Sequence, residues 1–296
     1  MNNFTTQNKL ALGTVQFGID YGINSGLKVN KNEVIKIINC ARNNGINLLD
    51  TAQLYGTSEE VLGEVNTNDF NVVSKTRGFD KGLITEKVAS KVTSDLDRSL
   101  KLLRRESLYA LLVHHGEDLL RTGGEMIFNQ LQILREQGLV KKIGVSAYID
   151  NQLIDIIDNF DLDIIQIPMN IFDRRLIDNG LLQKIHSKNI EIHTRSVFLQ
   201  GLLLMDKDKR PKKFDRWSGL WKYWYEWLAD NNLSALEASI RYMISLPEIS
   251  RVLVGVDNKE QFQKIINSVE GEIPSIPKEL STNDVDLLNP GNWGNL

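Results

Sequence analysis

The sequence predicts a (β/α)8 TIM barrel, an α/β fold in which one domain spans residues 1–296. Short apolar runs alternate along the chain with segments whose apolar residues recur at helical spacing. Eight strand–helix units can be counted, and this alternation is typical of a parallel sheet that eight units can close. No linker, low-complexity segment or short repeat divides the chain, and barrels of this kind reach this length as one domain.

The first four strands are expected where apolar runs are bounded by turn residues, at residues 9–17, 46–49, 70–74 and 108–113. Apolar residues between Val34 and Ala41 mark the first helix, and Gly45 supplies a left-handed stop after it. Thr57 and Glu60 have the spacing of a capping box for a short helix after the second strand. One apolar face through residues 88–103 then predicts a long helix.

The other four strands are expected at residues 142–145, 163–167, 190–194 and 251–254. Helices are expected at residues 123–137, 150–160 and 176–187, and within the aromatic-rich segment 217–245. Asp257 with Glu260 predicts the cap of the last helix. The irregular tail from about Gly271 contains three of the six prolines, and we expect it to pack across one end of the barrel.

Composition excludes several classes of function. Acidic and basic residues are interspersed and the net charge is −3, so there is no basic surface for nucleic acid. The only cysteine, Cys40, allows no disulfide within the chain and favours a reducing compartment. The first residues, MNNFTTQNK, lack the basic and apolar regions of a signal peptide. Because no apolar run approaches the ~20 residues that cross a bilayer, we expect a cytoplasmic protein without membrane contact.

Three polar residues follow or end neighbouring strands. Asp50 and Lys75 close the second and third apolar runs, and Tyr55 lies in the loop after the first of these. Barrel strands deliver active-site side chains at their carboxyl ends, so these three are expected to meet. A charged Lys75 would lower the pKa of the phenol, and Asp50 would hold the amine in place. Singly, each residue has an ordinary structural role, but together they indicate a site that transfers a proton.

Five segments resemble the aldo-keto reductase superfamily, and the likeness covers nearly the whole chain. LGTVQFG resembles its opening strand and INLLDTAQLYG its Asp–Tyr segment, while VVSKT, LLVHH and KIGVS resemble its Lys strand, its His strand and its fifth strand. The resemblance implies an eight-stranded barrel that binds a nicotinamide cofactor without a Rossmann domain. It further implies an NAD(P)-dependent oxidoreductase that interconverts a carbonyl and an alcohol by hydride transfer.

By this resemblance Tyr55 would be the general acid, Lys75 and Asp50 would tune it, and His114 would orient the substrate carbonyl. Ser146 and Gln166 match positions that bind the nicotinamide carboxamide, and RSVFLQG resembles the loop that wraps the pyrophosphate. The implied cofactor-binding residues are Gly13, Thr14, Asp50, Ser146, Gln166, Arg195, Ser196, Phe198, Gln200, Gly201, Gly255, Val256, Asp257 and Gln261.

The chain departs from the family pattern around the cofactor. Ala147 stands where many members have an Asn, and Arg195 where many have an aromatic side chain stacked on the nicotinamide. Gln261 replaces a common Arg, and Asp257 would repel an adenosine 2′-phosphate. The expected cofactor is therefore NADP(H) or NAD(H), with a weak preference for NADP or use of NAD.

The substrate is expected to be a small carbonyl or alcohol, such as a sugar or an anionic metabolite. Arg77 and Arg195 can receive a carboxylate or phosphate, and His115 and Trp217 are candidates for the mouth of the pocket. Trp217, Trp221 and Trp224 share one helical face, a pattern more typical of packing than of ligand binding.

Three alternatives remain at this point. A Schiff-base lyase would use Lys75 as nucleophile, but a neighbouring Asp50 would keep the amine protonated. A metal-dependent barrel is disfavoured because His114 and His115 are adjacent and point to opposite sides of a strand. The third alternative is a regulatory barrel that binds nicotinamide with little or no turnover. It differs from an oxidoreductase only in lacking rapid catalysis, and a screen for cofactor oxidation would distinguish the two.

Overall fold

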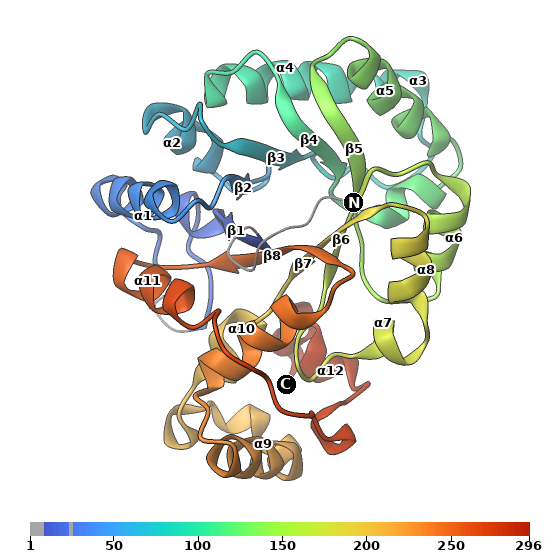
Figure 1. Cartoon of the computed structure of the whole chain (residues 1–296). Coiled ribbons are helices and arrows are strands. Elements are labelled where there is room, and N and C mark those ends of the chain that lie inside the picture. Colours follow the sequence, from blue (N-terminus) through green and yellow to red (C-terminus); the bar gives the residue numbers. More distant parts are fainter. Residues whose placement is uncertain (1–8, 24–25) are drawn as a thin grey trace.

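A computed structural model describes residues 9–23 and 26–296 and shows a closed barrel of eight parallel strands (Figure 1). Each strand pairs with the next and β8 pairs with β1, which confirms the predicted (β/α)8 barrel. The strands are β1 Leu10–Gly13, β2 Leu48–Asp50, β3 Asn71–Lys75, β4 Leu108–Val113, β5 Val140–Ser146, β6 Ile164–Pro168, β7 Glu191–Arg195 and β8 Ile249–Gly255.

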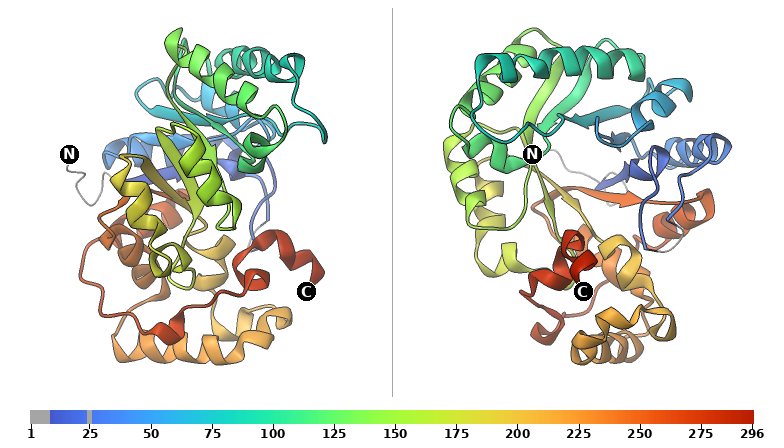
Figure 2. Two further views of the ribbon diagram at one scale, coloured as in Figure 1. Left: turned by 90° about the vertical axis from the view of Figure 1, so that its right-hand side faces the viewer. Right: turned by 180° about the vertical axis from the view of Figure 1, so that it is seen from behind.

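Helices surround the strands and cover the outer face of the barrel (Figures 1 and 2). The α-helices are α1 Lys31–Asn43, α2 Ser58–Glu64, α3 Glu86–Ala89, α4 Lys91–Leu103, α5 Glu125–Glu136, α6 Gln152–Asn159, α7 Arg175–Asp178, α8 Leu181–Ser187, α9 Ser218–Asp230, α10 Ala235–Ser245, α11 Lys259–Asn267 and α12 Val285–Leu288. Short 3-10 turns join them, among them η2 Val15–Phe17, η4 Leu199–Leu204 and η6 Lys212–Trp217.

The hydrophobic core has two parts because alternate residues of each strand face inward and outward. The larger part fills the space between strands and helices. The smaller part fills the barrel itself and consists of Ala11, Leu48, Val73, Ala110, Leu112, Ile164 and Leu253. In strands β2, β3 and β4, this inner layer lies two residues before Asp50, Lys75 and His114. The three polar side chains therefore lie on an apolar floor at the carboxyl ends of the strands.

Two capping predictions are wrong. The Thr57 hydroxyl makes no cap for α2, because it accepts a hydrogen bond from the Lys28 ammonium at 2.5 Å. The cap of α11 is Asn258, whose side chain accepts from the Gln261 N–H at 2.9 Å. Asp257 lies just outside that helix, and its N–H donates to the Gln261 side chain. Both errors arise because nearby side chains compete for the same donors and acceptors.

Other boundaries also differ from expectation. The first strand ends at Gly13, and residues 15–17 form η2 instead of extending it. The helix expected at residues 176–187 is two helices, separated at Gly180 with φ of 71°. The helix expected at 88–103 also divides, into α3 and α4 at Ser90. Gly45 does follow α1 in the left-handed region, with φ of 70°, as predicted.

The segment from residue 271 onward packs against the loop after β6 and against α9 (Figure 2). The Thr282 N–H donates to the Phe172 carbonyl, and the Trp217 indole donates to Asp284. Leu280, Leu287 and Trp293 are buried in this contact. Among the described residues, no helix combines the length and apolar character needed to cross a bilayer. Residues 1–8, on which the signal-peptide expectation rests, lie outside the described part of the chain.

Candidate active site

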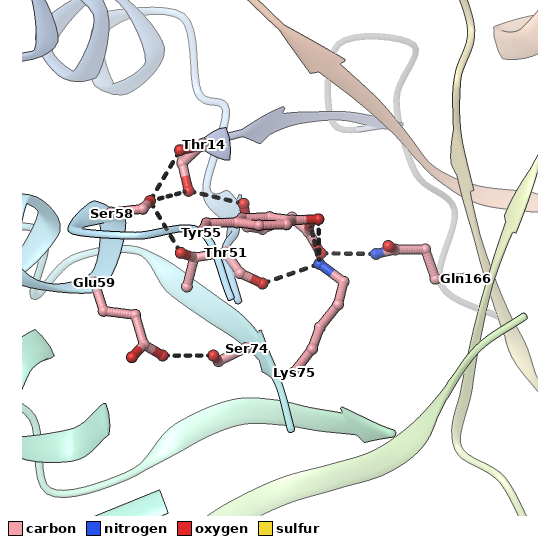
Figure 3. A network of polar contacts seen from close by, with 9 residues as sticks. Thr14, Thr51, Tyr55, Ser58, Glu59, Ser74, Lys75 and Gln166 are labelled. Carbon is pink, nitrogen blue, oxygen red and sulfur yellow. Dashed lines mark hydrogen bonds and ion pairs between the residues drawn. The ribbon is translucent and has the colours of Figure 1, made fainter. Parts of the chain in front are cut away.

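The fully buried ammonium of Lys75 is the centre of the site (Figure 3). At the end of β3, its Nζ donates to Asp50 Oδ2 at 2.6 Å and to the Thr51 carbonyl at 2.9 Å. The Tyr55 hydroxyl lies 3.5 Å from the same nitrogen. From the opposite side, the Gln166 amide donates to the other Asp50 oxygen at 2.7 Å. Side chains from β2, β3 and β6 and the loop after β2 thus form one hydrogen-bonded group.

Electrostatics keep the Lys75 amine charged. Burial alone would lower its pKa, but the adjacent Asp50 carboxylate and Tyr55 phenol hold the pKa of Lys75 above its ordinary value. A protonated amine is a poor nucleophile, so this environment is the opposite of the one that a Schiff-base lysine requires. It suits a cation that stabilises a neighbouring phenolate.

His114 follows β4 and faces the Tyr55 ring edge-on, with ring centroids 5.8 Å apart. Burial, followed by electrostatic interaction with Lys75, His115 and Arg195, lowers the pKa of His114 to about 3. The imidazole is therefore neutral at physiological pH. Its Nδ1 is buried and has no hydrogen-bond partner among the described residues. A neutral ring in this position can donate a hydrogen bond to an incoming oxygen without carrying charge.

A cavity of about 640 Å³ opens at the carboxyl ends of the strands, and most of the predicted site residues line it. Lys75 lies beneath the lining, in contact with Asp50 and Tyr55. The predicted residues that line the cavity are Gly13, Thr14, Asp50, Tyr55, His114, His115, Ser146, Gln166, Arg195, Ser196, Phe198, Gln200, Gly201, Gly255, Asp257 and Gln261.

Besides Lys75, three predicted residues are not among those that line the cavity. Arg77 is directed toward Asp95, with 3.9 Å between its Nε and the carboxylate, because the chain leaves the barrel after β3. Trp217 donates its indole N–H to Asp284 at 2.9 Å and packs against Phe214, as the packing interpretation of the tryptophans implies. The side chain of Val256 is buried in the core.

Several lining residues escape sequence reasoning. Gln16, Tyr21 and Tyr148 come from loops after β1 and β5, and the path of a loop cannot be read from apolar periodicity. Lys264 also lines the cavity. It lies three residues beyond Gln261 on α11, so helical spacing could have identified it as a neighbour of that residue.

Ser58 fixes the position of the Tyr55 loop. Its hydroxyl makes hydrogen bonds of 2.9–3.0 Å with the Thr14 carbonyl, the Thr14 hydroxyl and the Thr51 hydroxyl. Its N–H donates to the Tyr55 carbonyl at 3.0 Å. The next residue, Glu59, is buried and accepts hydrogen bonds from Ser74 and Ser99. The start of α2 is thereby joined to the residue after β1 and to β3 (Figure 3) and, through Ser99, to α4.

The fold and the buried polar group define a (β/α)8-barrel protein with a candidate active site at the carboxyl ends of its strands. The chain belongs to the aldo/keto reductase family, whose model matches residues 9–278. Membership of this family makes the protein an oxidoreductase, and the resemblance stated from sequence is confirmed.

Two curated relatives and one solved structure illustrate the range of this similarity. The chain is 22% identical over 280 residues to the uncharacterized oxidoreductase YqkF of Bacillus subtilis, covering 88% of this chain and 90% of the relative. It is 23% identical over 300 residues to a probable voltage-gated potassium channel subunit beta of Arabidopsis thaliana, covering 88% of each. The holo form of aldo-keto reductase AKR11C1 from Bacillus halodurans has the same fold, with a TM-score of 0.71, 17% identity and coverage of 93% and 94%.

In the described residues, no group of three or more His, Cys, Asp or Glu side chains is arranged to hold a metal ion.

Proposed function

We propose that the protein interconverts a small carbonyl compound and the corresponding alcohol with NAD(H) or NADP(H), using Tyr55 as general acid and base. The observation that carries this proposal is the contact of one buried ammonium, Lys75, with both the Asp50 carboxylate and the Tyr55 hydroxyl. The phenol lines the cavity, whereas the amine that tunes it lies below and is shielded from water.

When bound, a nicotinamide cofactor supplies or accepts the hydride. During reduction, the Tyr55 hydroxyl donates its proton to the carbonyl oxygen as that oxygen gains negative charge. Lys75 then stabilises the resulting phenolate, and Asp50 keeps Lys75 protonated and in place. The neutral His114 ring donates a second hydrogen bond to the same oxygen and so orients the substrate.

The chain residues around the cavity fit a dinucleotide. Ser146 and Gln166 provide polar groups in the lining that also contains Tyr55. After β7, Ser196 and the pair Gln200–Gly201 adopt positive φ values of 62°, 53° and 94°. Such left-handed residues can turn successive N–H groups toward one concave surface, which suits a pyrophosphate. Farther along the lining, the Gln16 side-chain oxygen is buried and has no partner among the described residues, so it can accept a hydrogen bond from a ligand.

A screen for oxidation of NADH and NADPH in the presence of aldehydes, ketones and sugars tests the proposed reaction. Turnover of any carbonyl, together with formation of the alcohol, would support it. Cofactor binding without turnover across the panel would contradict it and favour the regulatory alternative, in keeping with the similarity to a potassium channel subunit.

The choice between the two cofactors is expected to depend on Asp257 and Lys264, which line the cavity beside α11. Asp257 would repel the 2′-phosphate of NADPH and Lys264 would attract it. Because the two effects offset each other, we expect the KM values for NADPH and NADH to differ by less than about 100-fold. Asp257→Asn should favour NADPH, and Lys264→Gln should favour NADH, each by about fivefold in the ratio of the two KM values. Steady-state kinetics with both cofactors checks this, and a wild-type preference for NADPH beyond that limit would contradict it.

Gly18→Ala is expected to impair the enzyme by displacing the Tyr55 loop. A Cβ at Gly18 would lie 1.6 Å from the Tyr55 carbonyl oxygen and 2.6 Å from the Ser58 nitrogen. The loop must shift by about 1 Å, and such misplacement of a catalytic group costs about 100-fold in kcat. The matched control is Gly219→Ala, where a Cβ has no neighbour within 4 Å. Equal kcat values for the two variants would show that the contact does not position Tyr55.

A further inference from the structure

Arg195, at the end of β7, is a cation in the cavity without an anionic partner in the described part of the chain. Its Nη2 donates to the Ala147 carbonyl at 3.4 Å, and its guanidinium carbon lies 4.6 Å from the centroid of the Tyr148 ring. Its Nε is buried and has no acceptor among the described residues. By contrast, Arg175 is held by two bonds to Asp173.

The charges around Arg195 do not cancel its own. Lys75 and Asp50 form a pair that is neutral as a whole, and His114 is uncharged because its pKa is about 3. The remaining carboxylate of the lining, Asp257, lies beyond the end of β8 next to α11. The reacting end of the cavity therefore carries one uncompensated positive charge. A partly desolvated guanidinium is costly to leave unpaired and binds carboxylate or phosphate strongly.

The Tyr148 ring, whose centroid lies 4.6 Å from the guanidinium carbon, also restricts the position of the guanidinium. With one Nη2 bond made to a backbone carbonyl, the remaining N–H groups of Nη1 and Nη2 can serve a planar carboxylate or a phosphate. The sequence pattern pairs Arg195 with Arg77 for this purpose, but Arg77 is directed toward Asp95 and does not line the cavity.

We propose that Arg195 binds an anionic group of the substrate, so that the substrates are carbonyl compounds or alcohols carrying a carboxylate or a phosphate. This proposal rests on the function proposed above. The pyrophosphate of the cofactor offers Arg195 the same kind of anionic oxygen. In the proposed function it also lies near the loop after β7. The experiment must therefore measure substrate selectivity and cofactor affinity separately.

The test compares matched aldehydes: butanal with succinic semialdehyde, and glyceraldehyde with glyceraldehyde 3-phosphate. Wild-type enzyme should favour the anionic member of each pair in kcat/KM by at least about tenfold. In Arg195→Gln that selectivity ratio should fall by about tenfold, to near one, because a charge-assisted bidentate contact is lost. Arg195→Lys should retain part of the ratio. The control Arg77→Gln, a cation outside the cavity, should leave the ratio unchanged.

Two results would overturn the proposal. One is equal wild-type selectivity for both members of each pair. The other is an unchanged ratio in Arg195→Gln with a Kd for NADH raised tenfold or more, which would assign the residue to the cofactor. If no aldehyde is turned over, the proposed function fails, and the anion site is judged by thermal shift. Succinate or inorganic phosphate should then raise the Tm of the wild type but not of Arg195→Gln; equal shifts would refute the site.

Discussion

Tyr55→Phe is expected to lower kcat for carbonyl reduction by about 1,000-fold while leaving the Kd for the cofactor nearly unchanged. The aromatic ring would still fill its place beside His114, so the change removes the hydroxyl and little packing. Fluorescence titration with NADH or NADPH measures binding, and single-turnover kinetics measures the chemical step.

Tyr21→Phe provides the matched control, since Tyr21 is a second phenol in the same lining and its hydroxyl accepts a bond from Gln200. That variant should retain kcat within about tenfold, because the hydroxyl it removes has no buried ammonium beside it. A Tyr55→Phe enzyme with more than a tenth of the wild-type kcat would refute the assigned proton donor.

Lys75→Met is expected to abolish turnover and also to reduce the free energy of unfolding by about 3–5 kcal/mol. The Asp50 side chain is only 5% exposed, and its Oδ2 would lose the ammonium that now lies 2.6 Å away. An unpaired carboxylate in this position carries most of the destabilisation. Urea unfolding measures the loss, and a variant as stable as the wild type would contradict it.

The double variant Asp50→Asn with Lys75→Met separates the two effects. It removes both charges, so it should recover most of the stability lost in Lys75→Met, because a neutral buried pair requires no ion partner. It should not recover turnover, because Tyr55 would still have no cation to stabilise its phenolate. Recovery of kcat in the double variant would show that the ion pair supports folding alone.

The sequence was sufficient to predict the barrel and the residues that meet at its mouth. Asp50, Lys75 and His114 each end or follow an apolar run, and parallel strands in a closed barrel bring such positions together. Tyr55 could be added because it lies only five residues after Asp50. These relations depend on strand order and on alternation, which are visible in the residue pattern.

Features that depend on loop paths were not predictable in this way. Arg77 is two residues after Lys75, a spacing that would point it inward if β3 continued, but β3 ends at Lys75. Tyr148 and Lys264 reach the cavity through a loop and a helix face whose orientation only the fold defines. The hydroxyl of Thr57 was misassigned because its partner, Lys28, lies 29 residues earlier in the chain. Contacts between distant loops leave no periodic signal.

In the proposed mechanism, the apolar floor of the site would determine how Tyr55 is reprotonated between turnovers. Leu48, Val73 and Leu112 are fully buried two residues below the polar group, so solvent protons have no polar route to Tyr55 along these strands. A phenolate left after one reduction would therefore be neutralised from the open side, by the same passage through which the product departs. Product release and reprotonation of Tyr55 would then occur one after the other through the same opening of the cavity. A ligand bound there would delay both steps.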